Sequence, residues 1–208
     1  MLFTGKGDDG TTKTFGCNQR ISKSSAIAEA LGSVDEINSL LGVVKMQGGK
    51  TAATGEMDYH ALLSDVQQDL FIVQAELAGA EKKMDSARVE KLSGWVNAIE
   101  KELPPITSFF ISGGTELGAL CDYARTVARR AERRVVDALR NDRGDSVGSV
   151  RGESLALKGL SSNNAEHSNN EENHQHLLAY MNRLSSLLYA LARLANHRAG
   201  VKEEKPHY

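Results

Sequence analysis

Apolar residues recur every three or four positions in several separate stretches of this chain, which is the spacing of amphipathic helices. The stretches predict helices over residues 25–48, 59–80, 86–103, 115–139 and 175–199. Pro104 and Pro105 end the third stretch, because proline lacks an N–H and disfavours helix in the residue before it. Most connections are short, so we expect an all-α, up-and-down five-helix bundle without strands.

Residues 142–173 interrupt this pattern. They are rich in Asn, Asp, Ser, Gly and Glu and hold few apolar side chains. Such a composition cannot bury a core, so we expect a disordered polar insertion within one domain that spans residues 1–208. Three histidines in or beside the insertion could suggest a metal site. A polar segment explains them better because no predicted helix orders all three, and we expect no protein-bound metal.

The fourth predicted helix carries five arginines and one glutamate within residues 125–134. At about 100° per residue, Arg125, Arg129 and Glu132 fall within roughly 60° of one another, beside the apolar stripe rather than opposite to it. Guanidinium groups there present forked donors to phosphate oxygens or to a partner subunit. Arg130 and Arg134 point away from the core, and a solvated helix face accounts for them.

The first 24 residues show no helical period and contain the segment T-G-K-G-D-D-G-T-T at residues 4–12. Its glycines let the backbone approach a ligand closely, and its N–H groups can form a nest for an anion. Lys6, Lys13 and Lys23 add positive charge. The spacing is not that of a P-loop, and no strand–helix unit supports a Rossmann fingerprint. On composition alone, a flexible chain end is the commoner explanation.

The charge balance limits the class of ligand. The chain has 25 basic and 27 acidic residues and a net charge of −2, whereas general nucleic-acid binding relies on a basic surface. The arginine cluster therefore suits a small anion. Two cysteines without metal-ligand spacing, the lack of a signal-peptide pattern and the lack of an apolar run of about 20 residues predict a cytoplasmic protein that does not bind membranes.

The N-terminal segment and the arginine cluster occur together with V-D-E-I at residues 34–37, S-F-F-I-S-G-G at 108–114 and N-R-L-S-S-L-L-Y-A-L-A-R at 182–193. In this order they closely resemble the PduO-type family of ATP:cob(I)alamin adenosyltransferases, over almost the whole chain except residues 142–173. The resemblance implies a ferritin-like five-helix bundle that assembles as a homotrimer with active sites between subunits. It also implies ATP with Mg²⁺ and cobalamin as substrates, and it makes a reductase and an adenosylcobalamin-dependent enzyme candidate partners.

The resemblance further implies nucleotide contacts from the N-terminal segment, the arginine cluster and the last helix. These residues are Thr4, Gly5, Lys6, Gly7, Thr12, Lys13, Lys23, Arg129, Arg130, Ala131, Glu132, Arg133 and Asn182. Catalytic roles are implied for Asp35, Phe109, Arg125, Arg129 and Glu132. In this assignment Asp35 pairs with Arg125 across a subunit boundary, and Phe109 lies beneath the corrin ring.

The chain departs from the family pattern at two positions. Many members have a basic residue where this chain has Gly5, and many have proline where it has Ser112. The adjacent Phe110 leaves the residue beneath the corrin ring open by one position. The contact made by Lys6 and the rigidity of the Phe109 loop therefore stay open as well.

The reaction that the resemblance implies is transfer of the 5′-deoxyadenosyl group of ATP to the cobalt of a reduced corrinoid, with release of triphosphate. Cobalt(I) is the nucleophile, so the protein has to align the reactants and stabilise the charge of the leaving group. Two other classes stay open: a non-catalytic carrier or sensor that binds nucleotide and cobalamin, and a purely structural trimer. Turnover separates the first from the enzyme, and ATP binding excludes the second.

Overall fold

The computed structural model describes residues 2–15, 20–48, 58–142 and 174–207 of the chain. They contain α1 (Ala26–Gly48), α2 (Tyr59–Leu77), α3 (Ser86–Glu102), α4 (Glu116–Asp142), α6 (Gln175–Arg198) and the short strands β1 (Thr11–Thr12) and β2 (Ile21–Ser22). The helix boundaries agree with the sequence expectation to within three residues, which confirms the all-α bundle. The polar insertion predicted at 142–173 lies outside the described residues except for its first position.

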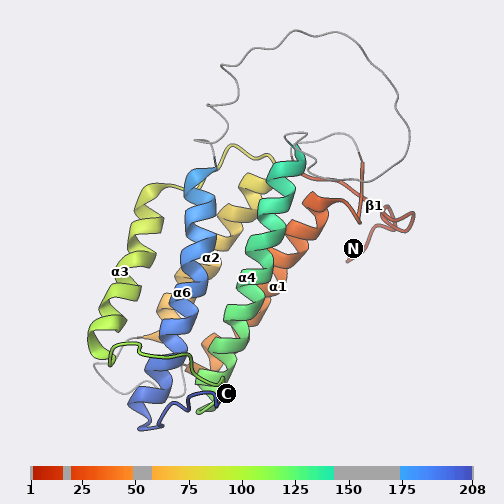
Figure 1. Cartoon of the computed structure of the whole chain (residues 1–208). Helices are drawn as coiled ribbons and strands as arrows, with labels where there is room; N and C mark the ends of the chain where they lie inside the picture. The colour runs from red at the N-terminus through yellow and green to blue at the C-terminus, as the bar shows by residue number, and fades with distance from the viewer. Residues whose placement is uncertain (1, 16–19, 49–57, 143–173, 208) are drawn as a thin grey trace.

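The helices run side by side as a bundle (Figure 1). α1 packs against α2 and α4, and α6 packs against α4 and α3. α4 therefore lies between α1 and α6, and side-chain pairs such as Lys91–Asp65 join α3 to α2. Within the part of the chain that the structure describes, no helix is both long enough and apolar enough to cross a membrane.

The predicted apolar stripes meet in one core. Its fully buried side chains include Val34, Ile37, Leu41, Val44, Leu63, Val66, Leu70, Val73, Leu92, Cys121, Ala124, Ala128, Ala131, Val135, Leu177, Leu184, Leu187, Leu188, Leu191 and Leu194. Burial stabilises such apolar surface by about 25 cal/mol per Å² and thereby fixes the rotation of each helix about its axis. Burial also raises the pKa of the Cys121 thiol to about 12, so this cysteine stays protonated at neutral pH.

The end of α2 differs from the sequence prediction, which continued the helix to residue 80. Gly79 has a φ of 85°, in the left-handed region that glycine enters without a Cβ clash. The N–H of Ala80 donates to the carbonyl of Ala75 at 2.9 Å, and that of Gly79 donates to Glu76 at 3.1 Å. This glycine-based cap satisfies the last carbonyl groups and ends the helix at Leu77.

The expectation of no strand is wrong for the N-terminal segment. β1 and β2 pair antiparallel, with Thr11 opposite Ser22 and Thr12 opposite Ile21. Arg20 supports this ribbon: its Nε donates to Thr11 Oγ1 at 2.5 Å and its Nη2 to the carbonyl of Thr11 at 2.9 Å. Two-residue strands are too short to produce an alternating pattern in the sequence. The described part of this segment is therefore an ordered loop rather than a free chain end.

Candidate active site

Two adjoining cavities lie on the face formed by α4 and α6. The larger, of about 620 Å³, is lined by Ile106, Thr107, Ser108, Phe109, Phe110, Ser112, Asp122, Arg125, Arg129, Ser185, Ser186 and Tyr189. The smaller, of about 450 Å³, is lined by Arg129, Glu132, Arg133, Val136, Asp137, Arg140 and Asn182. Arg129 lines both cavities, so a ligand in one and a ligand in the other would meet at its side chain.

The smaller cavity combines arginine donors with a fixed amide and carboxylate. Arg129 and Arg133 are exposed, and Nη1 of Arg133 donates to the carbonyl of Arg129 at 3.0 Å. Asn182 Nδ2 donates to Glu132 Oε1 at 3.0 Å, which joins α6 to α4 at the cavity wall. The structure thus brings together four of the residues predicted to contact nucleotide. Their forked cationic donors suit the oxygens of a phosphate chain.

Arg125 lies in the larger cavity and is held there by two neighbours. Its Nε contacts Asp122 Oδ1 at 2.5 Å, and its guanidinium lies 6.0 Å from the centre of the Tyr189 ring. Asp122 is only 8% exposed, and a buried carboxylate that lost its cationic partner would be strongly destabilising. Burial raises the pKa of Tyr189, so its hydroxyl stays neutral. Asp122 therefore fixes where Arg125 points before any ligand binds.

Phe109 and Phe110 lie on the wall of the larger cavity but differ in exposure. Phe109 is 80% exposed, whereas Phe110 is half-buried and its ring lies 5.2 Å from the guanidinium of Arg193. A large exposed aromatic ring beside a cavity is available to a ligand, and a ring already packed on an arginine is not. The geometry therefore favours Phe109 over Phe110 as the side chain that meets a bound ligand.

Arg130, Ala131 and Arg134 lie on the other sides of α4. Arg130 Nη2 contacts Glu36 Oε1 of α1 at 2.5 Å, and Arg134 Nε lies 4.0 Å from Glu29 Oε2. The side chain of Ala131 is fully buried in the core. These residues line neither cavity, so nucleotide contacts from Arg130 and Ala131 stay predictions.

The N-terminal segment folds back on itself through lysine and aspartate side chains. Lys23 Nζ donates to the carbonyl of Gly7 at 2.8 Å, and the Lys23 N–H donates to that of Gly10 at 2.9 Å. Asp9 accepts from both the hydroxyl and the N–H of Thr11, and these bonds lower the pKa of Asp9. These contacts hold the turn from Gly7 to Gly10 against Lys23, the residue that follows β2.

This segment lies apart from the two cavities within one chain. It extends from β1 beside the start of α1, on the side of α1 away from α6 (Figure 1). None of its described residues, including Thr4, Lys6 and Lys13, lines either cavity. Asp35 is exposed on α1 and also lines neither. The predicted site residues therefore form two groups, one on α4, α6 and the loop before α4, and one on α1 and the N-terminal segment.

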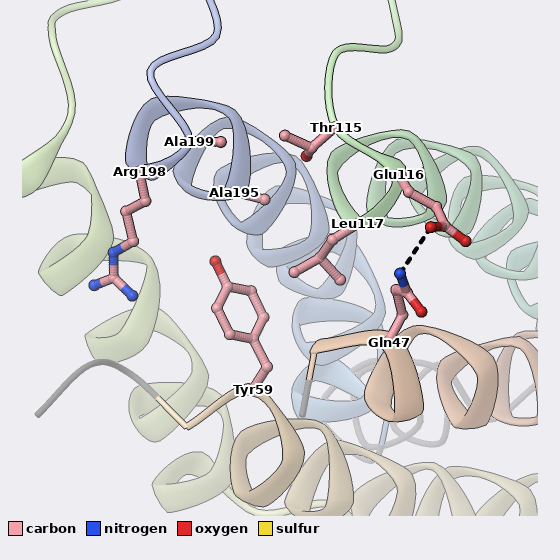
Figure 2. A pocket seen from close by; sticks show the side chains of 8 residues that line it. All are labelled: Gln47, Tyr59, Thr115, Glu116, Leu117, Ala195, Arg198 and Ala199. Atoms are coloured by element: carbon pink, nitrogen blue, oxygen red, sulfur yellow. Dashed lines mark hydrogen bonds between the residues drawn. The ribbon is translucent and has the colours of Figure 1, made fainter. Parts of the chain in front are cut away.

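A further cavity, of about 260 Å³, lies near the start of α4 and the end of α6 (Figure 2). Gln47 Nε2 donates to Glu116 Oε2 there at 2.8 Å, and Tyr59 and Arg198 also line it. It contains no residue predicted to bind nucleotide or corrinoid. We assign it no role.

Four residues that shape the site were not identified from the sequence as doing so. Asp122 could have been found, because it lies three positions before Arg125 on the same helix and i,i+3 pairs meet. No sequence pattern identifies Arg20, because its contacts with the N-terminal segment depend on the folded ribbon of β1 and β2. Arg193 and Asn196 of α6 bind the loop after α3, and such long-range contacts leave no local signal.

A helical bundle in which an arginine-lined cavity adjoins one with an exposed aromatic wall has room for a phosphate-bearing ligand beside one with apolar surface. The comparisons with known proteins identify the class further. A family model described as cobalamin adenosyltransferase matches residues 2–195. The chain therefore belongs to the cobalamin adenosyltransferase family.

Several relatives support this assignment. The chain is 30% identical to a corrinoid adenosyltransferase of Bacillus subtilis (strain 168), over 96% of this chain and 89% of that protein. It is 31% identical to the corrinoid adenosyltransferase PduO of Citrobacter freundii over 95% of this chain, and it spans about half of that longer protein, 50%.

A solved structure is similar over nearly the whole chain. It is that of a variant PduO-type ATP:corrinoid adenosyltransferase from Lactobacillus reuteri complexed with cobalamin and ATP. The TM-score is 0.76 at 25% identity, and the match covers 99% of this chain and 96% of that one. The helical architecture of the family is thus present throughout the described residues.

Proposed function

We propose that this protein is an ATP:corrinoid adenosyltransferase. Cobalt(I) of a reduced corrinoid attacks the 5′ carbon of ATP, a cobalt–carbon bond forms, the bond from that carbon to the triphosphate oxygen breaks, and triphosphate leaves. The observation that carries the proposal is the pair of adjoining cavities that meet at Arg129. Family membership and relatives named as corrinoid adenosyltransferases support it.

In this proposal the smaller cavity holds the nucleotide. Arg129 and Arg133 donate to the triphosphate and stabilise the charge that develops as it leaves, and Mg²⁺, when bound to the nucleotide, would neutralise further negative charge. Asn182 and Glu132, already hydrogen-bonded to each other, supply polar contacts at the wall. The N-terminal segment supplies backbone N–H groups at Gly5 and Gly7 and charge from its lysines. Thr4, Lys6, Thr12, Lys13 and Lys23 are its proposed contacts.

The larger cavity holds the corrin ring. Phe109 forms an apolar wall at the lower axial face of the cobalt, which keeps water and other axial ligands away. A cobalt(II) centre without that ligand is easier to reduce, so the wall favours formation of the nucleophile. Thr107, Ser112 and Ser186 can hydrogen-bond polar groups on the ring's periphery.

We also propose that the active site is completed between subunits of a homotrimer. The separation of the N-terminal segment and Asp35 from both cavities supports this, because a neighbour's segment can close the site that one chain leaves open. Asp122 contacts Arg125 through Nε, so the terminal nitrogens of Arg125 can take a second carboxylate, that of Asp35 from the next subunit. When this head-to-tail contact is repeated by threefold rotation, the third subunit contacts the first and the trimer is closed.

Three further features belong to the proposal. Residues 1–208 form one domain, in which 1–24 is the nucleotide loop and 142–173 a dispensable polar insertion. The low cysteine content supports a location in the reducing cytoplasm. A reductase that supplies cobalt(I) and an enzyme that accepts adenosylcobalamin are its expected partners.

An anaerobic assay with ATP, Mg²⁺ and chemically reduced cobalamin tests the proposal, followed by the visible spectrum and by triphosphate release. We expect the cobalt(I) band to be replaced by the spectrum of adenosylcobalamin, with one triphosphate released for each cobalt–carbon bond. A carrier or sensor would bind both ligands without this change. A structural trimer would not bind ATP, and either result would refute the enzyme.

A further inference from the structure

The loop between α3 and α4, residues 103–115, carries Phe109 yet contains no helix or strand. Ile106, Phe109 and Ile111 are all more than half exposed, so the loop is not held by burying its own apolar side chains. We propose that Arg193 of α6, together with Glu203 of the C-terminal tail, is a positioning residue that fixes this loop and thereby sets the place of Phe109. The inference rests on the proposed function.

The contacts of Arg193 go to the loop and to the tail. Arg193 is 5% exposed, and its Nη2 donates to the carbonyl of Pro104 at 3.1 Å. Its Nε donates to the two carboxylate oxygens of Glu203 at 3.2 and 3.1 Å, while the face of its guanidinium packs 5.2 Å from the Phe110 ring. A charge this buried is tolerated only when its partners are in place. The loop, the tail and α6 are therefore held as one unit.

Asn196, one helical turn further along α6, fastens the other end of the same loop. Its Nδ2 donates to the carbonyl of Gly113 at 3.0 Å, and its Oδ1 accepts from the N–H and the hydroxyl of Thr115 at 2.9 and 3.0 Å. Gly114 has a φ of 94°, and a Cβ there would lie 2.5 Å from Asn196 Oδ1. This close approach explains why a glycine precedes Thr115.

The tail fastens the middle of the loop. The N–H of Ile111 donates to the carbonyl of Glu204 at 2.8 Å, and the N–H of Val201 donates to that of Asn196 at 2.9 Å. Glu203, the partner of Arg193, thus lies next to the residue that holds Ile111. The tail is a support of the loop rather than a free end.

The orientation of Phe109 follows from these contacts. The two phenylalanines differ in exposure, since Phe109 is exposed while Phe110 is half-buried against Arg193. Both rings line the larger cavity, so holding Phe110 on the guanidinium fixes the backbone from which the exposed Phe109 ring projects. Arg193 does not line that cavity, so it acts through the loop and not on the ligand.

The test compares Arg193→Met, Arg193→Lys and Glu203→Gln with wild type. Arg193→Met replaces the side chain by one of similar length without the charge. Glu203→Gln removes the negative charge of one tail side chain, which is 17% exposed and lies outside the core. We expect Arg193→Met to raise KM for the corrinoid and to lower the rate from cobalt(II) with a reductant, each on the order of tenfold to a hundredfold. KM for ATP and the rate from pre-reduced cobalt(I) should change by about twofold at most, because the arginine-lined cavity is untouched. Arg193→Lys should recover part of the loss.

The spectrum of bound cobalt(II) corrinoid supplies a second readout. When cobalt(II) corrinoid binds to the wild-type protein, the cobalt should lose its lower axial ligand. In the Arg193→Met and Glu203→Gln variants this loss should be less complete. Asp65→Asn is the matched control, because it breaks the exposed Lys91–Asp65 pair of 2.7 Å between α2 and α3, which does not contact the loop. It should leave every readout unchanged.

Several outcomes would overturn the inference. One is a folded Arg193→Met variant with wild-type corrinoid KM and cobalt(II) spectrum, and another is an equal loss for ATP and corrinoid. If Arg193→Met does not fold, Glu203→Gln decides, and wild-type behaviour of that variant refutes the role of the pair. Failure of wild type itself to make adenosylcobalamin would refute the proposed function and is distinguishable from all of these.

Discussion

The two loops that face the proposed ligands are built in different ways. The loop of residues 103–115 is fastened to α6 by Arg193 and Asn196, which are 5% and 8% exposed. The N-terminal segment is held by Arg20 and Lys23, which donate to the carbonyls of Thr11 and Gly7 in half-buried and exposed surroundings respectively. Stranding a buried polar group costs about 1–3 kcal/mol, whereas a group nearer the surface can replace a lost hydrogen bond by one to water. Under the proposed function, we therefore expect the loop that carries Phe109 to be fixed before the corrinoid binds, and the N-terminal segment to rearrange when ATP binds.

Arg129→Ala should have the largest effect, because it removes the side chain common to both cavities. We expect a loss of about 2–4 kcal/mol of transition-state stabilisation, the scale of one charge-directed donor. The measurement is kcat/KM for ATP with pre-reduced corrinoid. A wild-type value would show that the Arg129 side chain, although it lines both cavities, does not contribute to catalysis.

Changing Lys6 and Lys23 together to Ala should weaken the binding of ATP and leave the binding of the corrinoid unchanged. We expect KM for ATP to rise about tenfold or more, since charge-assisted hydrogen bonds contribute about 1.5–3 kcal/mol each. The corrinoid KM and the cobalt(II) spectrum should stay as in wild type. Lys91→Ala on α3 is the control for lost surface charge. Equal losses for both substrates would mean that the two loops are not independent.

Phe109→Ala should damage only the corrin side. Starting from cobalt(II) with a reductant, the rate should fall by about tenfold, because an axial ligand can return to the exposed lower face. With pre-reduced cobalt(I) the loss should be much smaller, since that species already lacks the ligand. If both starting states lose equally and the cobalt(II) spectrum is unchanged, Phe109 only packs the loop, and Phe110→Ala becomes the variant to measure.

A double-mutant cycle between Asp35 and Arg125 tests whether the two regions meet across subunits. Asp35→Asn and Arg125→Ala should each reduce corrinoid binding or turnover, and the double variant should lose less than their sum, by about 0.5–3 kcal/mol. Asp122→Asn is measured alongside, because Arg125→Ala also strands Asp122 in the same chain. Additive losses of Asp35 and Arg125 in a protein that still assembles would argue against a direct contact.

Replacing residues 144–172 by a short Gly/Ser bridge should have the smallest effect. Their composition cannot bury a core, and the segment links the end of α4 to the start of α6. Turnover, oligomeric state and Tm should stay close to wild type. Loss of assembly or of turnover would give the insertion a structural role and would add a third region to the comparison.

The sequence predicted the helices well because their information is local. The recurrence of residues such as Val34, Ile37 and Leu41 identifies a buried face without knowledge of its partner. The arginine cluster was found for the same reason, since Arg129 and Glu132 lie on one helix. Asn182 was assigned to the site only through the resemblance to a known family.

What the sequence could not predict depends on contacts between distant segments. Arg193 carries no local signal of its burial, because it lies beneath a loop whose Pro104 is 89 positions earlier in the chain. The partner of Asn196 lies 83 positions away. The β1–β2 ribbon was missed because two residues carry no period. Such features follow from the packed fold and not from any local pattern.

The central claim is that each active site combines the N-terminal segment of one subunit with α4 and α6 of the next. Subunit mixing tests it most directly: the Lys6→Ala/Lys23→Ala protein and the Arg129→Ala protein are co-expressed, purified as mixed oligomers and assayed at low ATP. Random assembly should give about one site in four with both halves intact, so activity should return well above that of either variant alone. Activity no higher than that of the two separate variants would place both halves in the same chain and contradict the account.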